Sequence, residues 1–290
     1  MKKNILVLFL LILSLSAIRA QLLWKITGKG LKHPSYLFGT HNLISIQFLD
    51  SIPGLYKAFN ESNVVVTEMA LNNIDATVRI QKAAIMPKNI KIEDLLNKDE
   101  YKLVDTELKL VMKFGLKDVA IMNPSFLIKM YELEIFKKKT GFTDDNDSGS
   151  YFQLVAAEKG EKIVGLETVD QQIEALYGNG SFESRADKLV ETIQHKDTIL
   201  KQIISLNKLY KAGKIDEFFD LSKGENNLTE MASAEYAKLI DNRNTNWMTE
   251  LPNMMEQSSC FITLDAIHLG GQNGIIKLLE KDGYKLKPVK

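Results

Sequence analysis

The sequence predicts an α/β (α+β) fold in which a mixed β-sheet is built from both chain ends, with flanking helices and a long helical insert. Three observations lead to this prediction. Short apolar and β-branched runs gather between positions 22 and 68 and again beyond position 260. Helical patterning dominates from about residue 74 to residue 242. A strand–helix–strand pattern opens and closes the chain, so we expect the terminal strands to share one sheet.

The first twenty residues have the pattern of a cleavable signal peptide. Lys2 and Lys3 form a basic start, an apolar run follows, and Ala20 is a small residue before the cut. The run is shorter than the ~20 apolar residues that cross a bilayer, which favours export over the alternative of a retained anchor. We expect a mature domain of residues 21–290 that has no transmembrane segment and is periplasmic or extracellular.

Strand signals begin immediately after the predicted cut. Residues 22–26 and 35–38 are predicted to be strands separated by a turn at Gly28 and Gly30, a hairpin-like start. Residues 64–68 form a β-branched run, typical of a strand covered on both faces. The further expected strands are 163–166, 261–266 and 284–289.

Capping residues mark several ends of the expected helices. Asp99 is expected to cap one helix and Gly115 to end it, with Leu103 and Leu110 near one face. Asn123 followed by proline starts the next helix, which Gly141 and then a polar loop at 143–150 close. The expected helices are 51–59 (capped by Asp50 or Ser51), 99–114, 125–139, 171–177, 182–210, 216–221, 231–247, a short one from Pro252, and 274–280.

Charge and cysteine content narrow the function classes. The chain has 37 basic and 37 acidic residues, and removing Lys2, Lys3 and Arg19 leaves 34 against 37, a net charge of −3. No basic block or stripe stands out, so we expect no nucleic-acid partner. The single cysteine, Cys260, allows no intramolecular disulfide and is expected to be a buried, inert strand thiol.

Three residues at strand ends are the candidates for chemistry. His41, Glu68 and His268 each follow or end a predicted strand, where α/β folds assemble their sites. Two imidazoles and a carboxylate are a ligand set for a divalent metal, which lowers the pKa of bound water towards ~7. The alternative is a pair of hydrogen-bonded loop histidines and an ion-paired Glu68. No HExxH pair, Gly-rich phosphate loop or nucleophile elbow is present, and no organic cofactor is expected.

A series of sequence marks runs along the mature chain. The marks are Leu23-Trp24-Lys25-Ile26, Ser35-Tyr36-Leu37-Phe38-Gly39-Thr40-His41-Asn42, 64–68, Tyr151-Phe152-Gln153, Gly165-Leu166-Glu167-Thr168 with Gln171 or Gln172, Arg243-Asn244 with Trp247, Ala266-Ile267-His268-Leu269-Gly270-Gly271, Gly274-Ile275-Ile276, and Gly283-Tyr284-Lys285-Leu286. These marks resemble those of the TraB/GumN family, which includes PrgY and the Tiki proteases. The resemblance implies that family's fold, with two Gly-x-x-His motifs, and in the Tiki branch a divalent-metal-dependent peptidase activity.

The match departs from the family pattern at the presumptive site. Asn42 stands where the first motif has its histidine, with His41 one place early, and Asp265 replaces the glycine of the second motif. Asp265 either crowds the site or supplies an oxygen ligand. Gly149 stands where similar proteins often carry an acidic residue. These departures imply an altered metal preference or lost catalysis.

Two functions follow from the resemblance. The first is an exported metal-dependent hydrolase, peptidase-like, that uses Mn, Co or Zn. Glu68, Arg243 and His268 would be catalytic, and His41, Asn42, Glu68, Asp265 and His268 would hold the metal. The alternative is a non-catalytic member that binds a peptide or an envelope protein. In a purely structural interpretation, Glu167 and Arg243 form an ion pair that fastens the helical insert to the core while Trp247 packs.

Overall fold

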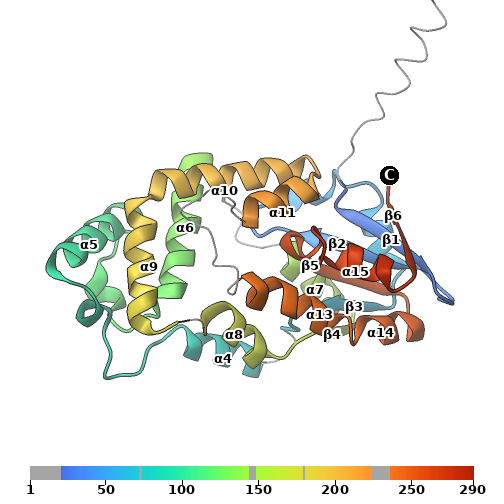
Figure 1. Cartoon of the computed structure of the whole chain (residues 1–290), viewed down its shortest axis with the longest axis horizontal. Coiled ribbons are helices and arrows are strands. Elements are labelled where there is room, and N and C mark those ends of the chain that lie inside the picture. The colour runs from blue at the N-terminus through green and yellow to red at the C-terminus, as the bar shows by residue number, and fades with distance from the viewer. Residues whose placement is uncertain (1–20, 72–73, 144–147, 179, 224–235) are drawn as a thin grey trace, which may run out of the picture.

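The computed structural model describes residues 21–71, 74–143, 148–178, 180–223 and 236–290 (Figure 1). The predicted signal peptide lies outside the described residues. So do residues 144–147 of the predicted polar loop at 143–150 and the first turn of the helix predicted at 231–247.

Both ends of the chain contribute strands to one mixed sheet, as predicted. The strand order is β4-β3-β5-β2-β1-β6. The first two strands form the predicted antiparallel hairpin, and the last strand pairs antiparallel with the first. The strands β2, β5, β3 and β4 run parallel to one another. The bounds are β1 Leu23–Gly28, β2 Ser35–Thr40, β3 Val64–Thr67, β4 Lys162–Gly165, β5 Cys260–Asp265 and β6 Tyr284–Pro288.

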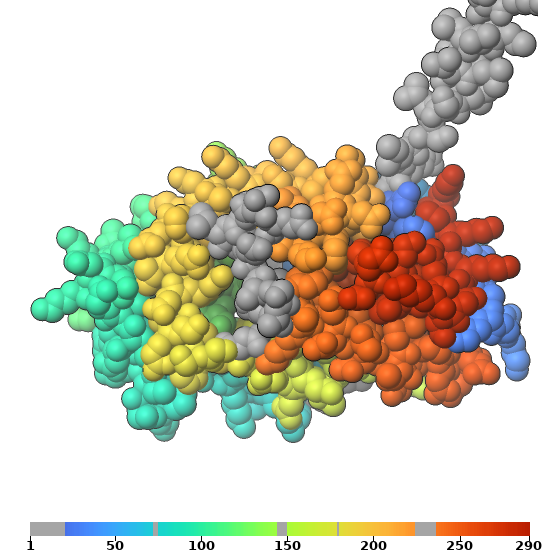
Figure 2. Space-filling view, in the orientation of Figure 1, coloured from blue at the N-terminus to red at the C-terminus, as the bar shows by residue number. Residues whose placement is uncertain are grey.

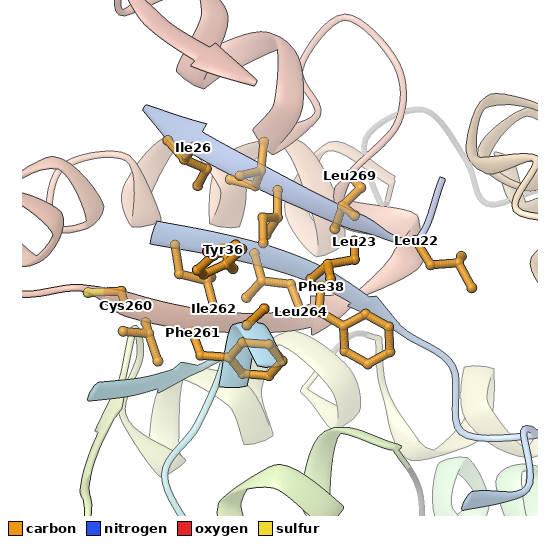
Figure 3. Packing of buried hydrophobic residues seen from close by; sticks show 14 of the residues in the cluster. Leu22, Leu23, Ile26, Tyr36, Phe38, Cys260, Phe261, Ile262, Leu264 and Leu269 are labelled. Atoms are coloured by element: carbon orange, nitrogen blue, oxygen red, sulfur yellow. The ribbon is translucent and has the colours of Figure 1, made fainter. Parts of the chain in front are cut away.

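An aromatic cluster packs on one face of the sheet. Phe38 of β2 and Phe261 of β5 stack with ring centroids 6.3 Å apart, and both point to the same side of the strands in Figure 3. Phe59 and Phe152, from helices that cover this face, contact Phe261 at 5.4 and 4.8 Å between centroids. Burial of this cluster together with aliphatic side chains explains why these strands are apolar in sequence. Cys260 is buried at the start of β5, and burial raises its thiol pKa to about 11, as expected of an inert thiol.

Helices from both halves of the chain surround the sheet. The bounds here are α2 Ile46–Leu49, α3 Leu55–Asn60, α4 Ile74–Ala83, α7 Ser148–Glu158, α8 Val169–Tyr177, α11 Ile215–Lys223, α13 Asn242–Trp247, α14 Leu251–Gln257 and α15 Ile275–Lys281, with a π-helical turn, η3, at Ala237–Asp241 and a 3-10 turn, η4, at Ala266–His268.

A separate group of helices, which we call the helical lobe, has its own hydrophobic core. This lobe lies at the left of Figure 1, and α10 runs from it towards the sheet. Its buried residues include Leu108, Leu127, Tyr131 and Leu189. The lobe contains η1 Ile92–Leu95, α5 Lys98–Met112, η2 Leu116–Val119, α6 Pro124–Thr140, α9 Phe182–Gln194 and α10 Lys196–Lys211. The insert thus supplies a second core beside that of the sheet, and the two parts abut in the space-filling view (Figure 2).

Some helix ends differ from the prediction. The cap of α5 is Asn97, in a capping box with Glu100, and the left-handed residue at its end is Lys113 rather than Gly115. Leu103 and Leu110 are exposed, because the buried face of this helix carries other residues. The helix predicted at 51–59 begins later, as α3 at Leu55 after Gly54, and a separate short helix, α2, capped by Ser45, ends at Leu49 before that range. The start and end of α6 at Asn123 and Gly141 are as predicted.

Two larger differences concern the middle of the chain. The helix predicted at 182–210 is broken at His195, whose backbone leaves the helical region (φ −107°, ψ 21°). No glycine or proline marks that break. The helix α7 begins inside the predicted polar loop. Its residues Phe152, Gln153 and Ala156 are buried, and such a helix lacks a clear amphipathic pattern. No helix among the described residues is both long and apolar enough to cross a membrane.

Candidate functional site

The carboxyl ends of the parallel strands meet at one edge of the sheet. Thr40 of β2 pairs with Asp265 of β5, and Thr67 of β3 pairs with both Thr263 of β5 and Gly165 of β4. Residues that follow these strands therefore lie close together, and Glu68, Glu167 and His268 are among them. We refer to Glu68, Glu167, Arg243 and His268 as the strand-end cluster.

Arg243 occupies the centre of the strand-end cluster. Its Nη2 donates to Oε2 of Glu68 at 2.7 Å and to Oε1 of Glu167 at 2.6 Å. Its Nε donates to the other oxygen of Glu167 at 3.1 Å, so Arg243 and Glu167 form a bidentate ion pair. Its Nη1 donates to the carbonyl oxygen of Leu239 at 3.2 Å and contacts Nε2 of His268 at 3.1 Å. The ion pair with Glu167 joins α13 to the end of β4, which agrees with the structural interpretation from sequence.

Backbone geometry explains how Arg243 reaches this position. The π-helical turn η3 immediately precedes α13, and such turns shift the side chains that follow them. The guanidinium carbon lies 4.8 Å from the ring centre of Trp247, one turn further along the helix. Trp247 is buried, and its ring also lies 4.5 Å from that of His268. The indole therefore packs against two members of the cluster.

Hydrogen bonds fix the tautomer of His268. Asn244 donates through Nδ2 to the carbonyl oxygens of His268 and Asn273. Its Oδ1 is therefore an acceptor, and it receives the proton of His268 Nδ1 at 2.7 Å. Nε2 carries no proton and accepts from Arg243. Burial lowers the pKa of His268 to about 4, and Arg243 adds to the effect while Glu68 opposes it.

Glu68 is the member of the cluster that solvent reaches most. Its side chain is 17 % exposed, against 8 % for Arg243 and 2 % for His268. Burial by itself would raise the pKa of Glu68, but His268, Arg243 and the N–H of Asp265 together lower it. For Glu167, burial outweighs the effect of Arg243 and raises the pKa. At neutral pH the cluster contains an ionised Glu68, a charged Arg243 and a neutral His268.

Glycine makes the close approach of these loops possible. A Cβ on Gly39 in β2 would come within 2.8 Å of Leu269, directly after the turn that carries His268. A Cβ on Gly165 in β4 would lie 2.8 Å from the backbone nitrogen of Ala70, just beyond Glu68. Contacts below 3.0 Å require the backbone or a neighbour to shift. These two glycines, both in stretches that resemble the family, therefore set the distance between the strand ends.

The other predicted ligands have different surroundings. His41 is buried with its ring 5.3 Å from the rings of Tyr210 and Phe218, on α10 and α11. Asn42 lies in an exposed turn. Asp265 donates its backbone N–H to Oε1 of Glu68 at 2.8 Å and uses Oδ1 to accept from the N–H of Ile267. The structure thus brings Glu68, Arg243 and His268 together, and Asp265 joins them through its backbone. Gly149 lies in the first turn of α7.

The donor atoms of the strand-end cluster do not fit a divalent metal in this arrangement. A metal ligand needs a lone pair directed at the ion at about 2.0–2.2 Å. Nε2 of His268 and Oε2 of Glu68 both accept from Arg243, and Oε1 of Glu68 accepts from Asp265. Within the described part of the chain, no three His, Cys, Asp or Glu side chains are grouped to hold a metal ion. The guanidinium of Arg243 lies between the carboxylates of Glu68 and Glu167 and the imidazole of His268.

Three further residues support the site, and the sequence gave them no role. Asn244 orients His268 as described above. Gln172 of α8 donates to Oε2 of Glu68 at 3.3 Å. Gln153 of α7 donates to Thr67 and accepts from the N–H of Leu71, which holds the loop that carries Glu68. All three lie in stretches that resemble the family, which was the available signal, but an amide side chain reveals its partners only in the folded chain.

The fold and the site define a mixed α/β protein with a buried ionic cluster at the carboxyl ends of its parallel strands. The chain belongs to the TraB/PrgY/gumN family, whose model matches residues 22–288. This finding confirms the resemblance seen in the sequence. The search of curated proteins and the search of solved structures each gave no match.

Proposed function

We propose that this protein is a non-catalytic member of its family that binds a peptide or an envelope protein at the carboxyl edge of its parallel strands. The observation that supports this proposal is the engagement of Glu68 and His268 by Arg243. A neutral histidine whose only free lone pair accepts from a guanidinium is a poor base, because a second proton at Nε2 would face the donor N–H of Arg243. The bond from Arg243 also occupies the one lone pair with which Nε2 of His268 would bind a metal.

Polar and apolar side chains beside the cluster support peptide binding. Phe126 of α6 stacks on Tyr177 of α8 with ring centroids 3.8 Å apart, so the helical lobe contacts the helix that carries Gln172. Lys129, one turn after Phe126, is exposed; nearby Glu132 and, further away, Tyr177 and Asp265 raise its pKa. Met130 and Leu176 are exposed apolar neighbours in sequence. Aromatic side chains and methionine are enriched in protein interfaces, so Phe126, Tyr177 and Met130 are the side chains here that favour peptide binding.

Two measurements test the proposal. The first is the metal content of the purified mature protein, with and without washing by a chelator; we expect far less than one metal ion per chain. The second is binding of a fluorescent peptide library. Glu68→Gln should weaken peptide binding, whereas Glu217→Gln, which alters a surface ion pair with Lys214, should not. If no peptide of the library binds to the native protein, the peptide-binding form of the proposal is wrong.

A metal-dependent, peptidase-like hydrolase is the second candidate. The observation that favours it is the short distance of 4.0 Å between Nε2 of His268 and Oε1 of Glu68, at an edge where Glu68 is partly exposed. In that case Arg243 would move aside and orient the substrate. Stoichiometric Mn, Co or Zn that chelation removes, together with metal-dependent cleavage of library peptides, would establish the hydrolase and overturn the non-catalytic proposal.

We also propose that the protein is exported, on the evidence of its N-terminal sequence. Cell fractionation followed by N-terminal sequencing tests this directly. The expected product is periplasmic or secreted and begins near Gln21. A chain that retains residues 1–20 and stays with the membrane would support the retained anchor instead.

A further inference from the structure

The outward face of α5 combines lysine with exposed leucine. Leu103 and Leu110 lie two turns apart on the same side of the helix, and their side chains are 38 % and 62 % exposed. Lys102 and Lys109 directly precede the two leucines, Lys113 follows directly after the helix, and all three are exposed. The opposite face of α5 is buried in the core of the helical lobe. The exposed face is therefore both basic and apolar.

The end of α6 adds a further lysine to this surface. Nζ of Lys138 donates to the backbone carbonyl of Leu110 at 2.9 Å, which places the last turn of α6 against the last turn of α5. We call Lys138 and the five residues of α5 the lysine–leucine face. Its members come from two helices, so the folded chain brings together side chains that are apart in the sequence.

The charge of the lysine–leucine face is predominantly positive. Asp105 pairs with Lys109 at 2.7 Å, and Lys98 and Asp99 have opposite charges in the first turn of α5. The ion pairs of the described residues leave three lysines of the face without an acidic partner, Lys102, Lys113 and Lys138. A partner that is anionic at its surface and apolar beneath complements this arrangement.

We propose that the lysine–leucine face docks the protein on an anionic lipid bilayer, with α5 lying in the plane of the headgroups. Leucine side chains enter the boundary between headgroups and acyl chains, and lysines beside them reach the lipid phosphates. The negative surface potential of such a bilayer attracts basic segments. A nucleic acid also offers phosphates, but it has no apolar layer beneath them to receive Leu103 and Leu110.

The position of α5 suits docking at the surface of a bilayer. In Figure 1 α5 forms the end of the helical lobe that lies furthest from the sheet, and in Figure 2 the side chains of this end project from a convex surface. The helix has 15 residues, fewer than the ~20 that span a bilayer, and its inner face is already occupied by the lobe core. Docking through α5 therefore holds the sheet, with its strand-end cluster, away from the lipid.

Cosedimentation of the purified mature protein with lipid vesicles tests the docking. We compare vesicles of phosphatidylcholine with vesicles that also contain phosphatidylglycerol, each at low and at high salt. The native protein should bind the anionic vesicles at low salt, and bind them more weakly at high salt. The variant Leu103→Gln with Leu110→Gln and the variant Lys102→Gln with Lys113→Gln should each bind the anionic vesicles at least about 10-fold more weakly.

Matched controls remove the same kinds of side chain elsewhere on the surface. Lys285→Gln with Lys287→Gln removes two exposed lysines from β6, and Leu154→Gln removes a leucine of α7 that is 55 % exposed. Both should bind like the native protein, and all four variants should keep the native unfolding temperature because every changed position is exposed.

Three results would overturn the docking proposal, and none of them bears on peptide binding at the strand-end cluster. The first is a native protein that does not bind anionic vesicles. The second is an equal loss of binding in the lysine variants of α5 and β6, which would assign the attraction to overall charge. The third is a native dimer in light scattering that the leucine variant of α5 converts to a monomer, which would assign the face to a second copy of the chain.

Discussion

The surroundings of His41 and His268 differ although the two residues have similar positions. Each follows a strand at the same edge of the sheet, each is buried, and burial lowers the pKa of each to about 4. His41 lies between the rings of Tyr210 and Phe218. His268 lies between Asn244, Arg243 and Trp247.

The difference shows that a strand end does not by itself determine the role of a histidine. The helices that cover the edge supply the neighbours, and they come from different parts of the chain. Aromatic residues of α10 and α11 surround the first histidine, whereas polar residues of α13 surround the second. Only His268 therefore belongs to an ionic cluster, and variants of the two regions should behave differently.

Loss of Arg243 should have the largest effect on stability. Arg243→Ala leaves the buried Glu68 and Glu167 without their cation, which typically costs about 3–5 kcal/mol of the free energy of unfolding. The matched variant Arg79→Ala breaks exposed ion pairs with two aspartates and should cost less than about 1 kcal/mol. Urea denaturation in chelator-containing buffer at pH 7 measures both values. Equal losses in the two variants would show that burial of the strand-end cluster has no energetic consequence.

The pH dependence of stability should report both histidines. Each has a pKa of about 4 in the folded chain against an ordinary value of 6.5, so between these values the unfolded chain binds protons that the folded chain does not. The free energy of unfolding should therefore fall as the pH falls from 6.5 to 4, by roughly 3 kcal/mol for each histidine. The raised pKa of Glu167 opposes this decline just above pH 4.5, because there the folded chain holds a proton that the unfolded chain has lost, and the lowered pKa of Glu68 acts at still lower pH.

Urea denaturation at a series of pH values separates the two contributions. His41→Phe and His268→Phe should each make the decline shallower, and the double variant should remove most of it between pH 6.5 and 5. A native protein whose stability is constant over that range would contradict the buried, neutral state of both residues.

Much of the fold was predictable because its signals are local. The β-branched run before Glu68, the turn glycines of the hairpin and the Asn-Pro start of α6 each lie within a few residues of the structure they determine. The break at His195 was missed because no glycine or proline marks it in the sequence. The candidate site was predictable to the level of which strand ends meet. Its electrostatics were not, because Asn244 and the fork of Arg243 act through contacts between residues far apart in sequence.

Replacing each histidine with phenylalanine at a fixed pH compares how much His41 and His268 contribute to the free energy of unfolding. His268→Phe leaves Oδ1 of Asn244 without the partner that donates to it and removes one of the two partners of Nη1 of Arg243, which should cost about 1–3 kcal/mol at pH 7. His41→Phe keeps an aromatic ring between Tyr210 and Phe218 and should cost less than about 1.5 kcal/mol. Thermal and urea unfolding measure both. A larger loss for His41→Phe would mean that its polar contacts, not its packing, hold that region.

The smallest effect should come from Asn42→His, the change that restores the histidine of the first family motif. The side chain of Asn42 is exposed in a turn, and Arg243 and Asp265 already occupy the acceptor atoms of Glu68 and His268. An imidazole at position 42 therefore meets no available pair of ligands. We expect the stability to change by less than about 0.5 kcal/mol and the affinity for Mn, Co and Zn to stay at the native level.

Calorimetry with the three metals at pH 7 checks this result, and Arg243→Ala combined with Asn42→His provides the control. In the Arg243→Ala background, the added histidine should change metal binding only if the turn that carries it reaches the strand-end cluster. Tighter metal binding in that background, and not in the native background, would show that the guanidinium prevents metal binding in the native protein. Tightening in the native background would instead place position 42 beside the cluster and contradict the separation of the two regions.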